Sequence, residues 1–127
     1  MPMYDSLSPL HTTVSSAWRG RTQCACDEVI ALVARRKNVP IRLLTHKSRS
    51  RLPVARARQL AMYLSHIVLG RSLLEIAEAF GRDRTTVSYA CAVIEDMRDD
   101  PRFDEEVTAL EQQIEAGMAG AEARHHG

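Results

Sequence analysis

A short polar run at residues 83–86 carries side chains well suited to recognising another molecule: Asp83, Arg84, Thr85 and Thr86. Apolar side chains follow it at helical spacing: Val87, Ala90, Cys91, Ile94 and Met97. This spacing predicts a helix that buries the apolar stripe and leaves the polar run on its exposed N-terminal turn. An arginine in such a turn can donate two hydrogen bonds to a guanine edge, so the pattern favours reading of bases in a DNA groove.

The residues before this run predict a first, shorter helix and a sharp corner. Ser72 followed by Glu75 forms a capping box, in which each side chain satisfies a backbone N–H at the start of a helix. Gly81 suits the left-handed residue that ends a helix, and Asp83 is a good N-cap for the next one. Together the two segments have the pattern of a helix-turn-helix.

Length and composition are those of one ordinary globular domain. The chain has 127 residues, of which 45% are hydrophobic and 26% charged, and only 5% are aromatic. Because strand-like alternation is scarce, we expect an all-α fold, a compact helical domain built around the helix-turn-helix. We expect a flexible arm over residues 1–22, the domain over residues 23–116 and a flexible tail over residues 117–127, with no membrane span.

Further helices are expected on both sides of the helix-turn-helix. One runs from Asp27, as N-cap, to Lys37, and a single turn begins near Pro40. A long helix follows Pro53 and runs to Leu69, and Asp100-Pro101 opens the last helix. The expected buried face of the long helix comprises Ala57, Leu60, Ala61, Leu64, Ile67 and Val68.

Charges are strongly segregated, although the net charge is only +1. No acidic residue lies between Glu28 and Glu75, whereas acidic residues outnumber basic residues from Glu95 onward. The basic residues of the middle segment are Arg35, Arg36, Lys37, Arg42, Lys47, Arg49, Arg51, Arg56, Arg58 and Arg71. Such a segment is typical of a nucleic-acid binder, although a charge run is often only a solvated face, and we interpret the acidic residues of the last helix as such a face.

The cysteines and histidines do not predict a metal site. Cys24 and Cys26 lack a second Cys/His pair at finger-like spacing, and Cys91 falls on an apolar stripe, so we expect it in the core. No Cys/His or Ser/His/Asp set converges on one segment, so we expect no catalysis and no cofactor. An odd number of cysteines and no signal-peptide pattern favour a cytoplasmic protein, and DNA binding would associate it with the nucleoid.

Three motifs give this sequence a specific resemblance to a known family. They are the Arg-rich loop leading into residues 54–64, the segment Ser72-Leu73-Leu74-Glu75-Ile76, and the segment from Phe80 to Val87. Roughly from Asp27 to Ile114, the chain resembles the C-terminal DNA-binding domain of the bacterial replication initiator DnaA. The resemblance implies an all-helical domain that binds short sites in double-stranded DNA.

The resemblance also implies roles for particular residues. The matching base-reading turn consists of Asp83, Arg84, Thr85 and Thr86. Arg58 and Gln59 match DNA-contacting positions, and Arg49 or Arg51 matches a loop arginine that enters the minor groove. The full set of expected DNA-binding residues is Arg49, Arg51, Arg56, Arg58, Gln59, Leu74, Asp83, Arg84, Thr85 and Thr86.

Two departures from the family pattern lie in the turn itself. The family usually has a second glycine after Gly81, so the turn here is one residue shorter. The family also usually has a histidine at the position of Arg84. The sequence also contains no Gly-x-x-x-x-Gly-Lys-Ser/Thr loop, so we expect no ATP binding.

The expected function is sequence-specific DNA binding that regulates transcription or replication initiation at DnaA-box-like sites, in possible competition with DnaA. The alternative is a protein-interaction module, with weak or no DNA binding, that docks through its acidic last helix.

Overall fold

A computed structural model describes residues 25–45 and 52–126, with side chains described as far as Met118, and every regular element in these ranges is a helix. A first helix occupies residues 25–37 and precedes α2 (Ile41–Thr45), α3 (Leu52–Ile67), α4 (Leu73–Phe80), α5 (Arg84–Met97) and α6 (Pro101–His126). The predicted all-α fold is confirmed. Among the described residues, no helix is both long and apolar enough to cross a membrane.

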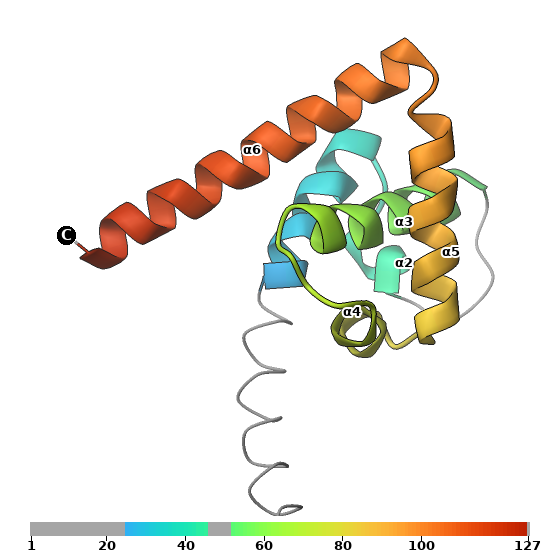
Figure 1. The fold of residues 1–127 in the computed structure, drawn as a ribbon, viewed down its shortest axis with the longest axis horizontal. Coiled ribbons are helices and arrows are strands. Elements are labelled where there is room, and N and C mark those ends of the chain that lie inside the picture. Colours follow the sequence, from blue (N-terminus) through green and yellow to red (C-terminus); the bar gives the residue numbers. More distant parts are fainter. Residues whose placement is uncertain (1–24, 46–51, 127) are drawn as a thin grey trace, which may run out of the picture.

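Helix α3 lies at the centre of the domain (Figure 1). It packs against α5, α4 and α2. Its apolar face is buried as predicted at Ala57, Leu60, Ala61 and Leu64, but Ile67 is 46% exposed. The prediction for Ile67 is wrong because α3 ends at this residue, where the chain turns toward Gly70, whose φ is 69°.

The first helix begins earlier than its sequence pattern indicated. Residues 25 and 26 are already helical, so Asp27 is not an N-cap, and Cys26 is fully buried one turn before Ile30. The end of the helix agrees with the prediction. Asn38 adopts a φ of 56°, a left-handed conformation that asparagine tolerates better than most residues, and the N–H of Val39 donates to the Ala34 carbonyl at 2.9 Å.

The segment around the basic loop also folds into helices close to the predicted positions. Helix α2 begins directly after Pro40, as expected. Helix α3 begins at Leu52 rather than after Pro53. Proline is tolerated there because the first N–H groups of a helix have no intrahelical acceptor.

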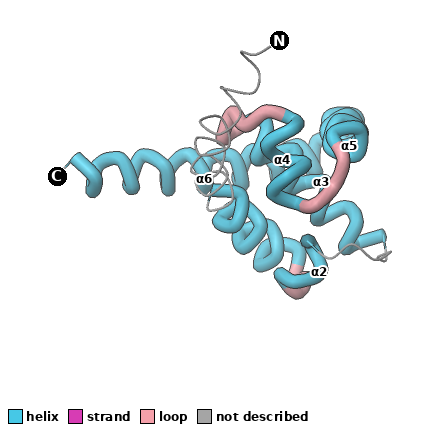
Figure 2. The backbone as a smooth tube through the Cα atoms, turned by 90° about the horizontal axis from the view of Figure 1, so that it is seen from below, coloured by secondary structure: helices cyan, strands magenta, loops and turns pink. Residues whose placement is uncertain are grey.

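Helix α6 opens as the sequence predicted. Pro101 is its first residue, and an Asp100 carboxylate oxygen accepts from the backbone N–H of Arg102 at 3.1 Å. The helix buries Val107, Leu110 and Ile114, then continues through Gly117 to His126. Gly117 therefore lies within the helix and not at its end. Figures 1 and 2 show the far end of α6 extending away from α5.

Several expectations lie outside the described residues. They concern the N-terminal arm over residues 1–22, Cys24, and the loop residues Arg49 and Arg51. The domain boundaries at residues 22/23 and 116/117 remain predictions.

Candidate nucleic-acid interface

Helix α4 starts with the predicted capping box. The Ser72 Oγ accepts from the Glu75 N–H at 3.1 Å, and the Glu75 carboxylate accepts from the Ser72 N–H at 2.7 Å. Ser72 itself is extended, with φ −71° and ψ 161°. Two N–H groups that lack intrahelical acceptors are thus satisfied, which fixes where α4 begins.

The two faces of α4 are sharply divided. Its inner face buries Ile76, Ala77 and Phe80, which recur at helical spacing. Leu74, one of the expected DNA-binding residues, is 56% exposed in the first turn. An apolar side chain at that exposure is not held by the core, so it is available to contact another molecule.

The corner between α4 and α5 depends on Gly81. This residue adopts φ 64° and ψ 38°, a left-handed conformation that costs residues with a Cβ about 1–2 kcal/mol. The Arg82 N–H donates to the Ala77 carbonyl at 2.8 Å, which closes the end of α4. Only Arg82 and Asp83 then separate Gly81 from the first residue of α5. The corner is tight, as predicted.

Asp83 occupies the N-cap position of α5 but does not cap with its side chain. Its backbone is extended, with φ −85° and ψ 160°, and the Val87 N–H donates to its carbonyl oxygen at 3.3 Å. No hydrogen bond joins its carboxylate to the first turn, so the expectation of side-chain capping is wrong. The carboxylate is exposed at the tip of the corner.

The first turn of α5 presents the predicted polar surface. Arg84 and Thr85 are exposed and Thr86 is half-buried, while Val87 and Ile94 have no exposed surface. Within the described part of the chain, no salt bridge joins Arg84 to Glu75 or Glu78, the two acidic residues of α4. The Arg84 guanidinium therefore forms no salt bridge with these residues of α4.

The exposed surface of α5 extends beyond the residues that the sequence singled out. Ser88 is exposed, and Tyr89 is 64% exposed although it is a large aromatic residue. Both continue the face of Thr85 at spacings of three and four residues. That spacing is visible in the sequence, and it could have added both residues to the candidate site.

Arg56 and Gln59 stand together near the start of α3. The Arg56 guanidinium donates to the Gln59 side-chain oxygen at 2.8 Å, and both side chains are partly exposed. The hydrogen bond orients the guanidinium along the helix surface.

Arg58 is placed differently from the surface arginines. Its side chain is only 8% exposed, and its guanidinium donates from Nε to the Leu44 carbonyl at 2.9 Å and from Nη2 to the Leu43 carbonyl at 2.7 Å. Burial lowers the pKa of Arg58, and the nearby charge of Arg82 lowers it further. Arg58 is therefore not solvated, and it ties the end of α2 to α3.

The acidic C-terminal region is engaged with the domain, contrary to the expectation of a purely solvated face. Lys37 Nζ lies 2.8 Å from a Glu106 carboxylate oxygen, and Arg36 lies 3.5 Å from the other. Arg98, at the end of α5, bonds to Asp104 at 2.5 Å and to Glu111 at 3.0 Å. These pairs hold α6 against the first helix and α5.

Arg98 also donates to the Tyr63 hydroxyl and the Thr108 hydroxyl, each at 3.1 Å. Burial by itself would lower the pKa of Arg98, but its hydrogen bonds to Glu111, Asp104 and Tyr63 raise it above its ordinary value. One guanidinium thus joins α3, α5 and α6 at the end of α5 remote from the polar first turn.

The described cysteines belong to the core. Cys91 is 9% exposed, as predicted, and burial, with a smaller effect from the charge of Glu95, raises its pKa to about 11. Cys26 has no exposed surface, and burial raises its pKa as well. Across residues 25–45 and 52–118, no three His, Cys, Asp or Glu side chains gather as metal ligands would.

Comparisons with known proteins agree with this arrangement. The family described as the bacterial DnaA protein helix-turn-helix matches residues 26–94. The chromosomal replication initiator protein DnaA of Laribacter hongkongensis is 38% identical over 97 residues, which cover 75% of this chain and 20% of that protein. DnaA of Psychromonas ingrahamii is 42% identical over 77 residues, which cover 60% of this chain and 17% of that protein. This chain therefore spans at most about a fifth of the curated relatives it matches.

Solved structures show the same fold. A crystal structure of a DNA replication initiation factor superposes with a TM-score of 0.70 at 26% identity, covering 89% of this chain and 35% of that one. A replication initiator DnaA bound to AMPPCP and single-stranded DNA superposes with a TM-score of 0.64 at 29% identity, covering 86% and 31%. The matched residues include α3, the capped α4, the Gly81 corner and most of α5. This chain belongs to the bacterial DnaA helix-turn-helix family.

Proposed function

We propose that this chain binds double-stranded DNA sequence-specifically through α4 and α5, and regulates transcription or replication initiation at DnaA-box-like sites that it shares with DnaA. The observation that carries the proposal is the first turn of α5. Arg84 and Thr85 are exposed there, and among the described residues no salt bridge occupies Arg84. An unengaged polar turn at the start of the second helix is the part of a helix-turn-helix that contacts bases.

Each side chain of this turn suits a base edge. Arg84 can donate two hydrogen bonds to guanine O6 and N7, where the family usually has a histidine. The Asp83 carboxylate, which does not cap the helix, can accept from a cytosine amino group. Thr85 and Thr86 offer a hydroxyl and a methyl group, and the methyl group suits contact with thymine.

Contacts to the DNA backbone come from a wider set of residues. Arg56 and Gln59 lie at the start of α3, and Leu74 lies at the start of α4. By resemblance, Arg49 or Arg51 enters the adjacent minor groove. The arginines of this set neutralise phosphates, and Gln59 and Leu74 add uncharged contacts; such phosphate contacts fix the orientation of the domain but carry no sequence information.

Arg58 also belongs to the proposed interface, because it matches a DNA-contacting position of the family. Its guanidinium is bound to two α2 carbonyls, so we further assign it the task of holding the end of α2 against α3.

We further propose that this activity needs no ATP and takes place in the cytoplasm, at the nucleoid. The sequence lacks the glycine-rich loop and lysine that cradle nucleotide phosphates. The affinity for DNA then depends on the domain itself and not on a bound nucleotide. Titration with ATP should leave DNA affinity unchanged.

Selection from a randomised duplex pool tests the proposal. We expect enrichment of a short shared motif, and gel-shift competition should show that this motif is bound at least ~10³-fold more tightly than scrambled duplex. Recovery of no motif, with equal affinity for all duplexes, would contradict sequence-specific binding. A DnaA-box oligonucleotide in the same competition tests whether the site is shared with DnaA.

The protein-interaction alternative relied on a free acidic face of the last helix. Asp104, Glu106 and Glu111 instead form ion pairs within the domain. Their charge is therefore partly neutralised, which weakens that alternative.

A further inference from the structure

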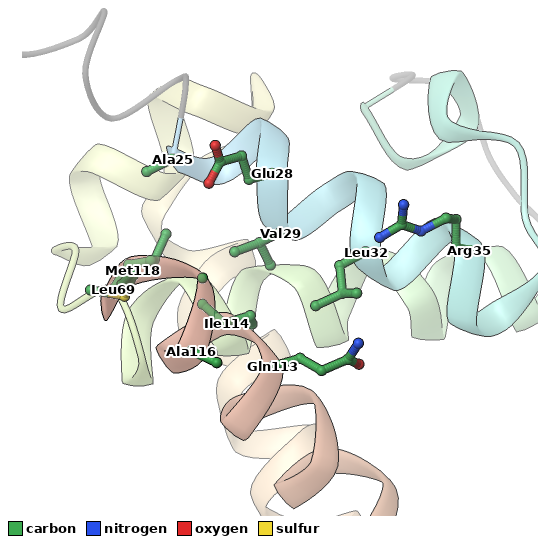
Figure 3. A pocket seen from close by; sticks show the side chains of 11 residues that line it. Ala25, Glu28, Val29, Leu32, Arg35, Leu69, Gln113, Ile114, Ala116 and Met118 are labelled. Carbon is green, nitrogen blue, oxygen red and sulfur yellow. The ribbon is translucent and has the colours of Figure 1, made fainter. Parts of the chain in front are cut away.

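A groove lies between the first helix and α6, on residues that the proposed DNA interface does not use. Its volume is about 430 Å³. Figure 3 shows side chains from the first helix and from α6 lining it, together with Leu69, which follows α3. Its larger apolar lining residues are Val29, Leu32, Leu69, Ile114 and Met118. Met118 is 39% exposed, so the groove opens to solvent at that end.

Two opposite charges flank this groove on one helix. Glu28 and Arg35 both line it, and both are exposed. They are separated by two helical turns, about 10 Å along the axis at a rise of ~1.5 Å per residue, so they lie too far apart to pair with each other.

Neither charge is satisfied within the described chain. Arg36 and Lys37, the neighbours of Arg35, both pair with Glu106, whereas no salt bridge of Glu28 or Arg35 occurs among residues 25–45 and 52–118. Leu32 lies about halfway between the two charges on the same face and is half-buried. The face thus carries a negative end, an apolar centre and a positive end.

We propose that this face binds a second copy of the chain, with the two first helices antiparallel across a two-fold axis near Leu32. In such a symmetric contact the same patch meets itself. Glu28 then faces the partner subunit's Arg35, and Arg35 faces the partner subunit's Glu28. The interface therefore contains two symmetry-related ion pairs. A parallel arrangement would place like charges together, which is unfavourable.

The proposal goes beyond DNA binding and does not depend on it. The groove is built by the first helix, α6 and Leu69, whereas the polar first turn belongs to α5. Two copies joined here would each keep that turn exposed, and linked domains gain affinity on paired sites through effective concentration.

Sedimentation velocity of the full chain without DNA, over a concentration series, tests the proposal. We expect a reversible monomer–dimer equilibrium. Arg35→Glu and Glu28→Arg should each weaken dimerisation at least ~10-fold, because each places like charges opposite each other twice in one interface. The double variant, Glu28→Arg with Arg35→Glu, should restore dimerisation. Arg102→Glu, an exposed reversal at the other end of α6, is the control matched in net charge to Arg35→Glu.

Each result has a defined meaning, because circular dichroism can establish that these surface variants are folded. A monomer at every concentration would overturn the proposal. So would a dimer that ignores both single reversals, which would indicate that another segment forms the contact. Loss of the dimer in the single variants without recovery in the double variant would exclude the antiparallel arrangement. Gel-shift affinity for a single site is measured separately, so failure here leaves the proposed function untouched.

Discussion

The guanidinium of Arg58, on α3, donates a 2.9 Å hydrogen bond from Nε to the main-chain oxygen of Leu44, on α2. A second bond, from Nη2, reaches the Leu43 carbonyl at 2.7 Å. Both carbonyls lie at the end of a five-residue helix, where no intrahelical donor is available. One buried side chain therefore caps the C-terminal end of α2 and joins α2 to α3.

We predict that Arg58→Ala destabilises the domain rather than only weakening DNA binding. Removal of the guanidinium leaves the Leu43 and Leu44 carbonyls without these donors, a loss of roughly 2–3 kcal/mol. Chemical denaturation should show it as a lower midpoint with an unchanged slope. Arg58→Lys should not restore stability, because an ammonium group cannot span both carbonyls as the planar guanidinium does.

The matched control is Arg56→Ala, on the same helix. Within residues 25–45 and 52–118, the Arg56 side chain bonds only to Gln59, on the same partly exposed surface, so stability should change by no more than about 0.5 kcal/mol. If the two variants were equally stable, the anchoring role assigned to Arg58 would be refuted.

Arg98→Ala should also destabilise the domain, through α6. The side chain bonds to Asp104, Glu111, Tyr63 and Thr108, and Asp104 is partly exposed, so we expect a loss of roughly 1–3 kcal/mol. Hydrogen exchange should show weaker protection of the first turns of α6, with little change in α4. Equal loss of protection throughout would argue against a local role, and Arg102→Ala, at an exposed position, should leave both measurements unchanged.

Ser72→Ala should weaken α4 by about 1 kcal/mol, because it leaves the Glu75 N–H without its side-chain acceptor. The exposed site has no cavity to fill, so the effect isolates the cap. Thermal unfolding measures it, and Ser72→Asp should recover most of the loss since aspartate is also a preferred N-cap. A fully stable Ser72→Ala variant would mean that the capping box does not set the start of the helix.

DNA affinity should fall steeply with salt. Three cations of the basic segment are engaged within the domain, Arg36 and Lys37 with Glu106 and Arg58 with α2. If roughly six phosphates are neutralised by the remaining cations, the slope of log K against log salt should be about −5, from ~0.9 per phosphate. A slope near zero in a gel-shift titration would exclude an electrostatic footprint of this size.

Local patterns predicted the helix-turn-helix well because each of its parts depends on neighbouring residues. The Ser72–Glu75 capping box and the left-handed Gly81 are determined by short-range geometry. The same holds for Asp100-Pro101 at the start of α6 and for Asn38 at the end of the first helix.

The sequence-based predictions failed where a contact joins residues that lie far apart in the sequence. Lys37 and Glu106 are 69 residues apart in the sequence, so their pairing depends on the tertiary fold. The burial of Arg58 likewise depends on carbonyls 14 and 15 residues away, and a basic segment gives no sign of which arginine turns inward. The start of the first helix was misplaced because Asp27 has good N-cap chemistry, whereas the burial of Cys26 extends the helix upstream.

The most direct test of the account compares specific and scrambled duplexes for variants of the first turn of α5. Arg84→Ala and Thr86→Ala should each cost about 1–3 kcal/mol on the selected site and little on scrambled duplex, because base contacts are lost while phosphate contacts remain. Arg42→Ala, at an exposed position on α2, is the control and should not alter the ratio between the two duplexes. Equal losses on both sequences for Arg84→Ala and Thr86→Ala, in variants shown by circular dichroism to be folded, would contradict base reading by α5.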